Sequence, residues 1–124
     1  SLKHSAFVAL IELDDVLALA SPPAVFRALP QFPATVRDVS LVAASDTPAG
    51  AIAKAIRDLA LETVEAVELA DVYDDEASLG KGKRSLTFSI TYRHPERTLK
   101  DDEVNAAQEK VRTHLATTFN ADLR

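Results

Sequence analysis

Several residue types that define common protein classes are absent from this chain of 124 residues. It has no cysteine, which excludes a disulfide framework and makes a reducing cytoplasm the expected compartment. It has no methionine, which predicts that Ser1 is not a natural translation start and that the chain is a piece of a larger protein. Its apolar runs are short and broken by charge, so we expect neither a secretory leader nor a membrane-spanning helix of about 20 apolar residues.

Two neighbouring stretches of the sequence are each dominated by charges of one sign. The net charge of −5 argues against a dedicated nucleic-acid binder. Residues 62–76 carry acids and no base, whereas 80–100 carry one acid and a cluster of bases. The bases are Lys81, Lys83, Arg84, Arg93, Arg97 and Lys100. This stretch could neutralise a few phosphates, but charge alone favours the alternative of a solvated surface loop.

Proline divides the chain into a lead-in part at 1–33 and a main domain at 34–124. Residues 6–13 have the pattern of a strand, and Asp14 or Asp15 is expected to cap a short helical turn after it. The turn ends where the prolines begin, and residues 21–34 then form an extended connector.

The main domain has the periodicities of a mixed α+β fold. Strands are predicted at 36–44, 64–73, 84–93 and 121–124, and helices at 48–61 and 101–118. Leu69 and Val72 differ in parity, which predicts a bulge near Asp71. The order strand, helix, strand, strand, helix, strand is that of the ferredoxin-like split β-α-β fold, with two helices on one face of an antiparallel sheet.

Strand and helix parity assigns side chains to two faces of that sheet. The expected core contains Val39, Leu41, Ile52, Ile56, Leu59, Leu69, Leu86, Phe88, Ile90, Val104, Val111 and Leu115. The open face would display Asp38, Ser40, Thr87, Ser89, Thr91 and Arg93. Such a polar platform suits single-stranded RNA, although any half-buried antiparallel sheet has a polar outer face.

Motifs of catalysis and of metal binding are absent. His4, His94 and His114 lie far apart in the sequence and beside no regular carboxylate spacing, so no metal centre is expected. The chain has no glycine-rich phosphate loop and no nucleophile elbow. An acylphosphatase-like hydrolase shares the topology but needs a water-positioning asparagine, and Asn105 and Asn120 fit that role poorly. The sequence therefore predicts a non-catalytic domain without a metal or cofactor of its own.

Short segments, in order along the chain, resemble one known family. They read FPA, RDVSLV, VELADVY, GKRSLTF, RTL and DEVN, and the chain ends in NADLR. Together they resemble the ferredoxin-fold anticodon-binding domain of bacterial phenylalanyl-tRNA synthetase beta chains, over about 32–124. Three features depart from that pattern: Ala70 stands where an aromatic is usual, Lys100 where a capping Thr is usual, and the loop after Tyr73 lacks an early glycine. Thr98 or Asp101 is then expected to cap the second helix.

The resemblance implies a role in the ATP-dependent ligation of phenylalanine to tRNA(Phe). This domain would bind the anticodon stem-loop, and a partner alpha subunit would carry the catalytic site. The complete enzyme would contain two alpha and two beta chains and would use ATP and magnesium, neither of which this domain would bind. A docking or small-molecule-sensing module that binds no RNA is the alternative.

The same resemblance implies two anticodon contacts. Tyr73 matches the tyrosine of the DVY block and is expected to stack on a base, and Ser85 matches the serine after the basic pair and is expected to hydrogen-bond that base. The residues expected to hold the RNA backbone are Lys83, Arg84, Arg93 and Arg97. The alternative for Tyr73 is a structural tyrosine that caps the core with its ring.

Overall fold

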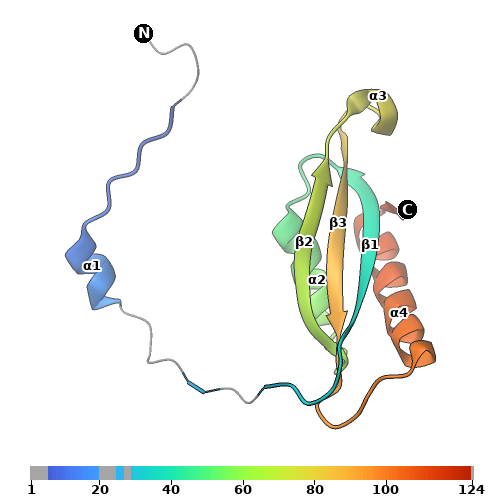
Figure 1. The fold of residues 1–124 in the computed structure, drawn as a ribbon. Helices are drawn as coiled ribbons and strands as arrows, with labels where there is room; N and C mark the ends of the chain where they lie inside the picture. The colour runs from blue at the N-terminus through green and yellow to red at the C-terminus, as the bar shows by residue number, and fades with distance from the viewer. Residues whose placement is uncertain (1–5, 20–24, 27–28, 124) are drawn as a thin grey trace.

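A four-stranded antiparallel sheet, with two helices on one face, forms the main domain (Figure 1). This computed structural model describes residues 6–19, 25–26 and 29–123. Its elements are α1 (Leu13–Ala18), β1 (Thr35–Ala44), α2 (Ala49–Asp58), β2 (Val64–Tyr73), α3 (Glu76–Leu79), β3 (Lys83–Tyr92), α4 (Asp101–Phe119) and β4 (Asp122–Leu123). The strand order is β2-β3-β1-β4. The predicted ferredoxin-like α+β fold is confirmed, and none of the described helices is long and apolar enough to cross a bilayer.

The core lies between the sheet and the helices α2 and α4. Strand β3 is central and pairs with β1 and β2, so its alternate residues Leu86, Phe88, Ile90 and Tyr92 meet the helices and are fully buried. The other predicted core residues that are buried are Val39, Leu41, Ile52, Ile56, Val104, Val111 and Leu115. Leu59 is partly buried against this cluster.

Leu69 does not belong to the core, so this prediction is wrong. It pairs with Phe88 and therefore has the parity of the buried face, but 45% of its surface is exposed. Strand β2 is an edge strand, and its partly buried residues all lie in its first half. The register of β2 on β3 shifts between Leu69 and Asp71, which confirms the predicted bulge.

Helix α4 is fixed to the sheet by a buried tyrosine. The Tyr92 hydroxyl donates to Gln108 Oε1 at 2.6 Å, and Gln108 Nε2 donates to the Asp38 carbonyl at 3.0 Å. Burial raises the pKa of Tyr92 to about 12. The link runs from β3 through α4 to β1 and fixes the helix over the centre of the sheet.

Helix α4 begins after Lys100, so the expected cap at Thr98 or Asp101 is wrong. Glu103 replaces it, because its carboxylate accepts the Lys100 N–H at 3.0 Å. The same carboxylate accepts two hydrogen bonds from the Arg97 guanidinium, at 2.6 and 2.7 Å. These bonds, with that from Arg97 the largest cause, lower the pKa of Glu103 to about 2.

The lead-in part contains the expected helix but not the expected strand. Helix α1 is the short helix, but it begins at Leu13 after Glu12, so the expected cap at Asp14 or Asp15 is wrong and both lie in its first turn. Residues 6–12 form no strand and expose their apolar side chains, including Phe7 at 97%. A strand needs a partner edge, and no strand of the described ranges pairs with this segment, which runs apart from the sheet in Figure 1. The expected stop at Pro22 and Pro23, and the final residue of the last strand, lie outside the described residues.

Candidate nucleic-acid interface

One end of the sheet brings Tyr73 and Ser85 together. Tyr73 is the last residue of β2 and pairs directly with Ser85 of β3. Directly opposed residues of antiparallel strands project from the same face, and the parity of β3 places this pair on the face away from α2 and α4. Tyr73 is 47% exposed and Ser85 is 9% exposed. The pair therefore offers an accessible tyrosine side chain beside a largely buried serine.

The Tyr73 side chain is held at its hydroxyl end. Its hydroxyl donates to Asp75 Oδ2 at 2.9 Å, and Ser78 Oγ donates to the same oxygen at 3.0 Å. Asp75 Oδ1 accepts the Ala77 N–H at 3.0 Å and so caps α3. The hydrogen bond from Tyr73 is the largest cause that lowers the pKa of Asp75. The core cluster of the described residues does not include Tyr73.

Helix α3 lies in the segment that the sequence indicated only as a charged loop. It is four residues long and contacts β3, and its Leu79 is buried. Asp75 directly before it is a signal for a helix start that the loop composition concealed. Gly80 and Gly82 have φ of 91° and 73°, which lets the chain leave α3 and enter β3 in a short turn.

The predicted cationic residues divide between the two ends of β3. Lys83 and Arg84 begin this strand beside Ser85, whereas Arg93 follows its other end and Arg97 lies beyond it in the segment leading to α4. At about 3.3 Å per strand residue, Ser85 and Arg93 lie roughly 26 Å apart. The fold therefore places only Lys83 and Arg84 at the end of β3 that carries Tyr73 and Ser85. Of these two, only Lys83 has the parity of Ser85 and projects from the same face, whereas Arg84 projects toward α2.

The two cations near Tyr73 differ in how firmly the fold holds them. Lys83 Nζ lies 3.7 Å from Asp122 Oδ2, and both side chains are largely exposed. Arg84 donates through Nη2 to the Thr47 carbonyl just before α2, and its buried Nε has no hydrogen-bond partner among the described residues. Lys83 is the more available charge, since an exposed pair at that distance is weak.

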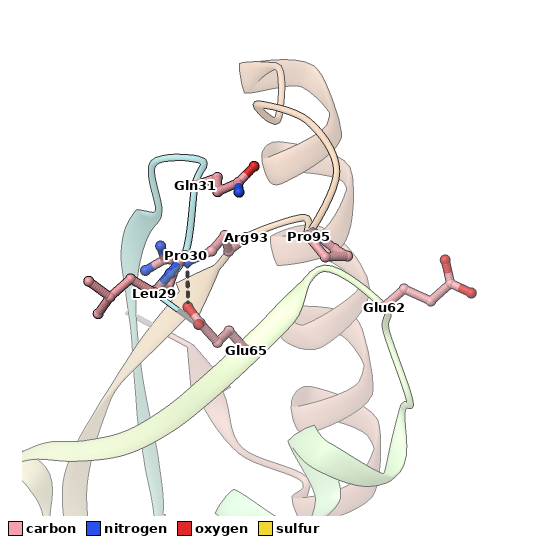
Figure 2. Close-up of a pocket in the computed structure, with 7 residues that line it drawn as sticks. All are labelled: Leu29, Pro30, Gln31, Glu62, Glu65, Arg93 and Pro95. Carbon is pink, nitrogen blue, oxygen red and sulfur yellow. Dashed lines mark hydrogen bonds and ion pairs between the residues drawn. The ribbon is translucent and has the colours of Figure 1, made fainter. Parts of the chain in front are cut away.

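The two distant arginines form closer ion pairs. Arg93 lines a hollow of about 550 Å³ together with Glu65 (Figure 2). The Arg93 Nε lies 2.9 Å from Glu65 Oε2. Arg93 also donates to the Phe32 carbonyl at 2.9 Å, which fastens the connector to the end of the sheet. Arg97 is held by Glu103 through two hydrogen bonds, and this contact raises the pKa of Arg97.

The middle of the open face uses its polar groups internally. Ser40 and Thr87 hydrogen-bond across β1 and β3 at 2.8 Å, and Ser89 donates to Asp38 on the same pair of strands. These cross-strand bonds occupy much of the predicted platform. Across the described parts of the chain, no group of three or more His, Asp or Glu side chains is arranged to hold a metal ion.

Comparison with known proteins shows the family of this chain. Residues 30–124 match the family model described as the ferredoxin-fold anticodon binding domain, which confirms the resemblance found in the sequence.

Three bacterial relatives named phenylalanine–tRNA ligase beta subunit match nearly the whole chain. The protein of Moorella thermoacetica is 44% identical over 108 residues, which are 87% of this chain and 13% of the relative. The protein of Geobacillus kaustophilus is 40% identical over 118 residues, or 95% of this chain and 15% of the relative. That of Shouchella clausii is 35% identical over 121 residues, or 98% and 15%. The chain thus spans about one seventh of the length of these relatives.

Proposed function

We propose that this chain, which belongs to the ferredoxin-fold anticodon-binding domain family, binds the anticodon stem-loop of tRNA(Phe). The observation that carries the proposal is the direct pairing of a half-exposed Tyr73 with Ser85 at one end of the open face. The names of the relatives support phenylalanine as the cognate amino acid. The proposal makes this chain a recognition domain rather than a catalytic one.

Recognition starts with a base that leaves the anticodon stack. Its flat face lies on the exposed ring of Tyr73, a contact worth about 1–3 kcal/mol by alanine substitution. Its edge then reaches the hydroxyl of Ser85, which can both donate and accept a hydrogen bond. Ser85 has little exposed surface, so a stacked base would cover the rest of it. A base edge that cannot hydrogen-bond to the hydroxyl would then leave that hydroxyl without a partner. Stacking supplies affinity in this scheme, and Ser85 supplies discrimination.

The backbone contacts fall into two groups in this scheme. Lys83 and Arg84 form the first group, at the end of β3 that carries Tyr73. Lys83 projects from the face of the stacked base and can turn from Asp122 to a phosphate at little cost, whereas Arg84 projects toward α2 and donates to the Thr47 carbonyl. Arg93 and Arg97 form the second group. They reach the RNA only where a phosphate shares the guanidinium with Glu65 or with Glu103. Lys83 therefore carries most of the electrostatic attraction.

The complete protein would be the beta subunit of a phenylalanine–tRNA ligase in the cytoplasm. It would assemble with a second beta subunit and two alpha subunits, and the enzyme would use ATP and magnesium to join phenylalanine to the tRNA. The relatives' names support the ligase assignment, and their greater length leaves room for the parts that bind these partners. The domain itself would hold neither ATP nor magnesium.

A titration with RNA tests the proposal. The chain is mixed with a labelled tRNA(Phe) anticodon stem-loop and with a control of the same stem and a scrambled loop, at about 50 mM salt. Any base can stack on Tyr73, so the hydrogen bond to Ser85 decides between the two loops. The native loop should bind about 5- to 150-fold more tightly, the range that corresponds to about 1–3 kcal/mol for a hydroxyl left without a partner. Equal affinity for the two loops would favour a docking or small-molecule-sensing module.

A further inference from the structure

We infer that Asp75 is a positioning residue that holds the Tyr73 ring ready for stacking before the RNA arrives. This inference rests on the proposed function and names a residue outside the expected contact set. Tyr73 stands at the end of an edge strand, where the ladder with β3 stops at its own pairing with Ser85. Its side chain is not part of the core, so its far end needs another restraint.

The restraint is the Asp75 carboxylate, and both of its oxygens accept hydrogen bonds. Oδ2 accepts the Tyr73 hydroxyl at 2.9 Å and the Ser78 hydroxyl at 3.0 Å. Oδ1 accepts the Ala77 N–H at 3.0 Å, which joins the carboxylate to the first turn of α3. Helix α3 is itself anchored, because Leu79 is buried and the helix contacts β3. The phenol is thus connected through one carboxylate to the sheet.

Fixing the ring at its hydroxyl leaves its faces accessible. Nearly half of the Tyr73 surface remains exposed while the hydroxyl is bound. A side chain that is already ordered loses less conformational freedom on binding. Without Asp75 the ring would have to be ordered by the RNA, and the affinity should fall by about 2- to 10-fold, the effect of ordering one more side chain.

The charge of Asp75 acts in the opposite direction, and this makes a sharp control possible. A carboxylate beside an RNA site repels phosphates, so its removal by charge alone should strengthen binding. Asp74 is the adjacent residue and has the same charge, but it is exposed and forms none of the hydrogen bonds found around Tyr73. Asp74→Ala therefore reports the effect of charge without the effect on Tyr73.

The test compares four single variants and one double variant in stem-loop binding. Asp75→Ala should bind about 2- to 10-fold more weakly than the parent, whereas Asp74→Ala should bind as tightly or more tightly. Asp75→Asn should bind close to the parent, because an amide oxygen can still cap α3 and accept a hydrogen bond from Tyr73. Tyr73→Phe keeps the ring and the Asp75 charge but loses the anchor, and should bind at least as weakly as Asp75→Ala. Adding Asp75→Ala to Tyr73→Phe should then weaken binding little further. A full additional loss in that double variant would overturn the inference, since Asp75 would act through α3 alone.

Tyrosine-labelled NMR spectra provide a readout that a purely structural role would not change. The chain has two tyrosines, and the buried Tyr92 serves as an internal reference. In free Asp75→Ala the ring signals of Tyr73 should move toward unstructured values while those of Tyr92 stay fixed. If the parent fails to distinguish the native loop from the scrambled loop, the proposed function is wrong. If the parent distinguishes them and Asp75→Ala binds equally well, only the role of Asp75 is refuted.

Discussion

Replacing Lys83 with Gln tests where the RNA backbone meets the sheet. Lys83 lies at the start of β3, two residues before Ser85, and its ammonium is 3.7 Å from the exposed Asp122 carboxylate. That pair is too exposed to hold the charge strongly, so the ammonium can neutralise a phosphate and release one counterion. Loss of one such contact reduces the slope of log K against log salt by about 0.7 to 0.9. Between about 50 and 200 mM salt, the affinity advantage of the parent over the variant should therefore shrink about threefold.

Arg97→Gln is the matched comparison at the far end of the sheet. The Arg97 guanidinium already donates twice to Glu103, at 2.6 and 2.7 Å, so its charge is largely compensated before RNA binds. Its removal should leave the salt slope nearly unchanged. Arg93→Gln should behave in the same way, because Glu65 already pairs with that guanidinium at 2.9 Å. Fluorescence anisotropy of a labelled stem-loop, titrated at four or more salt concentrations, measures all three slopes.

The opposite ranking would refute this reasoning. If the salt slope decreased by the amount of one phosphate contact in Arg93→Gln and Arg97→Gln, but not in Lys83→Gln, the RNA would lie at the connector end of β3. The stacking role of Tyr73 would then be untenable, because a span of roughly 26 Å separates Ser85 from Arg93. Equal reductions in all three variants would instead require an RNA that follows the whole length of the strand.

Three further predictions concern the fold. Phe88→Ala removes a fully buried ring from the centre of β3 and should lower the free energy of unfolding by about 3–5 kcal/mol in a denaturant titration, whereas a change below about 1 kcal/mol would contradict its central place. The Glu103 carboxylate has a folded pKa of about 2 against its usual 4.5, so its stabilising contribution is complete above about pH 5 and is lost as the pH falls toward 2. The stability difference between the parent and Glu103→Gln, measured by denaturation across that range, should shrink accordingly, and a constant difference would refute the assignment. A chain shortened to 30–124 should keep the melting temperature of the parent within a few degrees, because the apolar side chains of 6–19 are exposed, and a large drop would show that they stabilise the domain.

Much of the fold could be predicted because the periodicity of the main domain is strong. The alternation through Leu86, Phe88 and Ile90 gave the central strand with its correct face, and the α4 stripe followed from helical spacing. Leu69 shows the limit of that reasoning. Parity tells which face a side chain projects from, but whether a helix covers that side chain depends on tertiary packing. The second half of edge strand β2 has no such cover, and its side chains are exposed.

Residues 6–13 show a second limit of pattern alone. Their short apolar run satisfies the local condition for a strand, but a strand forms only beside another edge that completes its hydrogen bonds. The sequence cannot state which edge that is. The four-residue α3 was missed for a related reason, because a single capping Asp75 in a charged stretch carries less signal than the loop composition around it.

The candidate site was predictable to the extent that it depends on one hairpin. Tyr73 and Ser85 lie near the facing ends of consecutive strands, so short-range register alone brings them together. The cationic stretch was different, because Arg84 and Arg93 are close in the sequence but lie at opposite ends of the extended strand β3. Residues that are close in the sequence are far apart along the sheet when an extended strand lies between them. Only the structure shows which charges lie at the same end of β3 as Tyr73.

The position of Tyr73 and Ser85 at the end of the sheet follows from how the polar groups of this domain are used. In the middle of the open face, Ser40 bonds Thr87 and Ser89 bonds Asp38, so an RNA base there would have to displace existing hydrogen bonds. At the end of β2, by contrast, the hydroxyl of Tyr73 is satisfied by Asp75, but the faces of its ring require no polar partner. Stacking therefore uses surface that the fold does not need for itself. A base that stacks there gains its contact without breaking a bond within the protein, which favours the strand end over the centre of the sheet as the place of recognition.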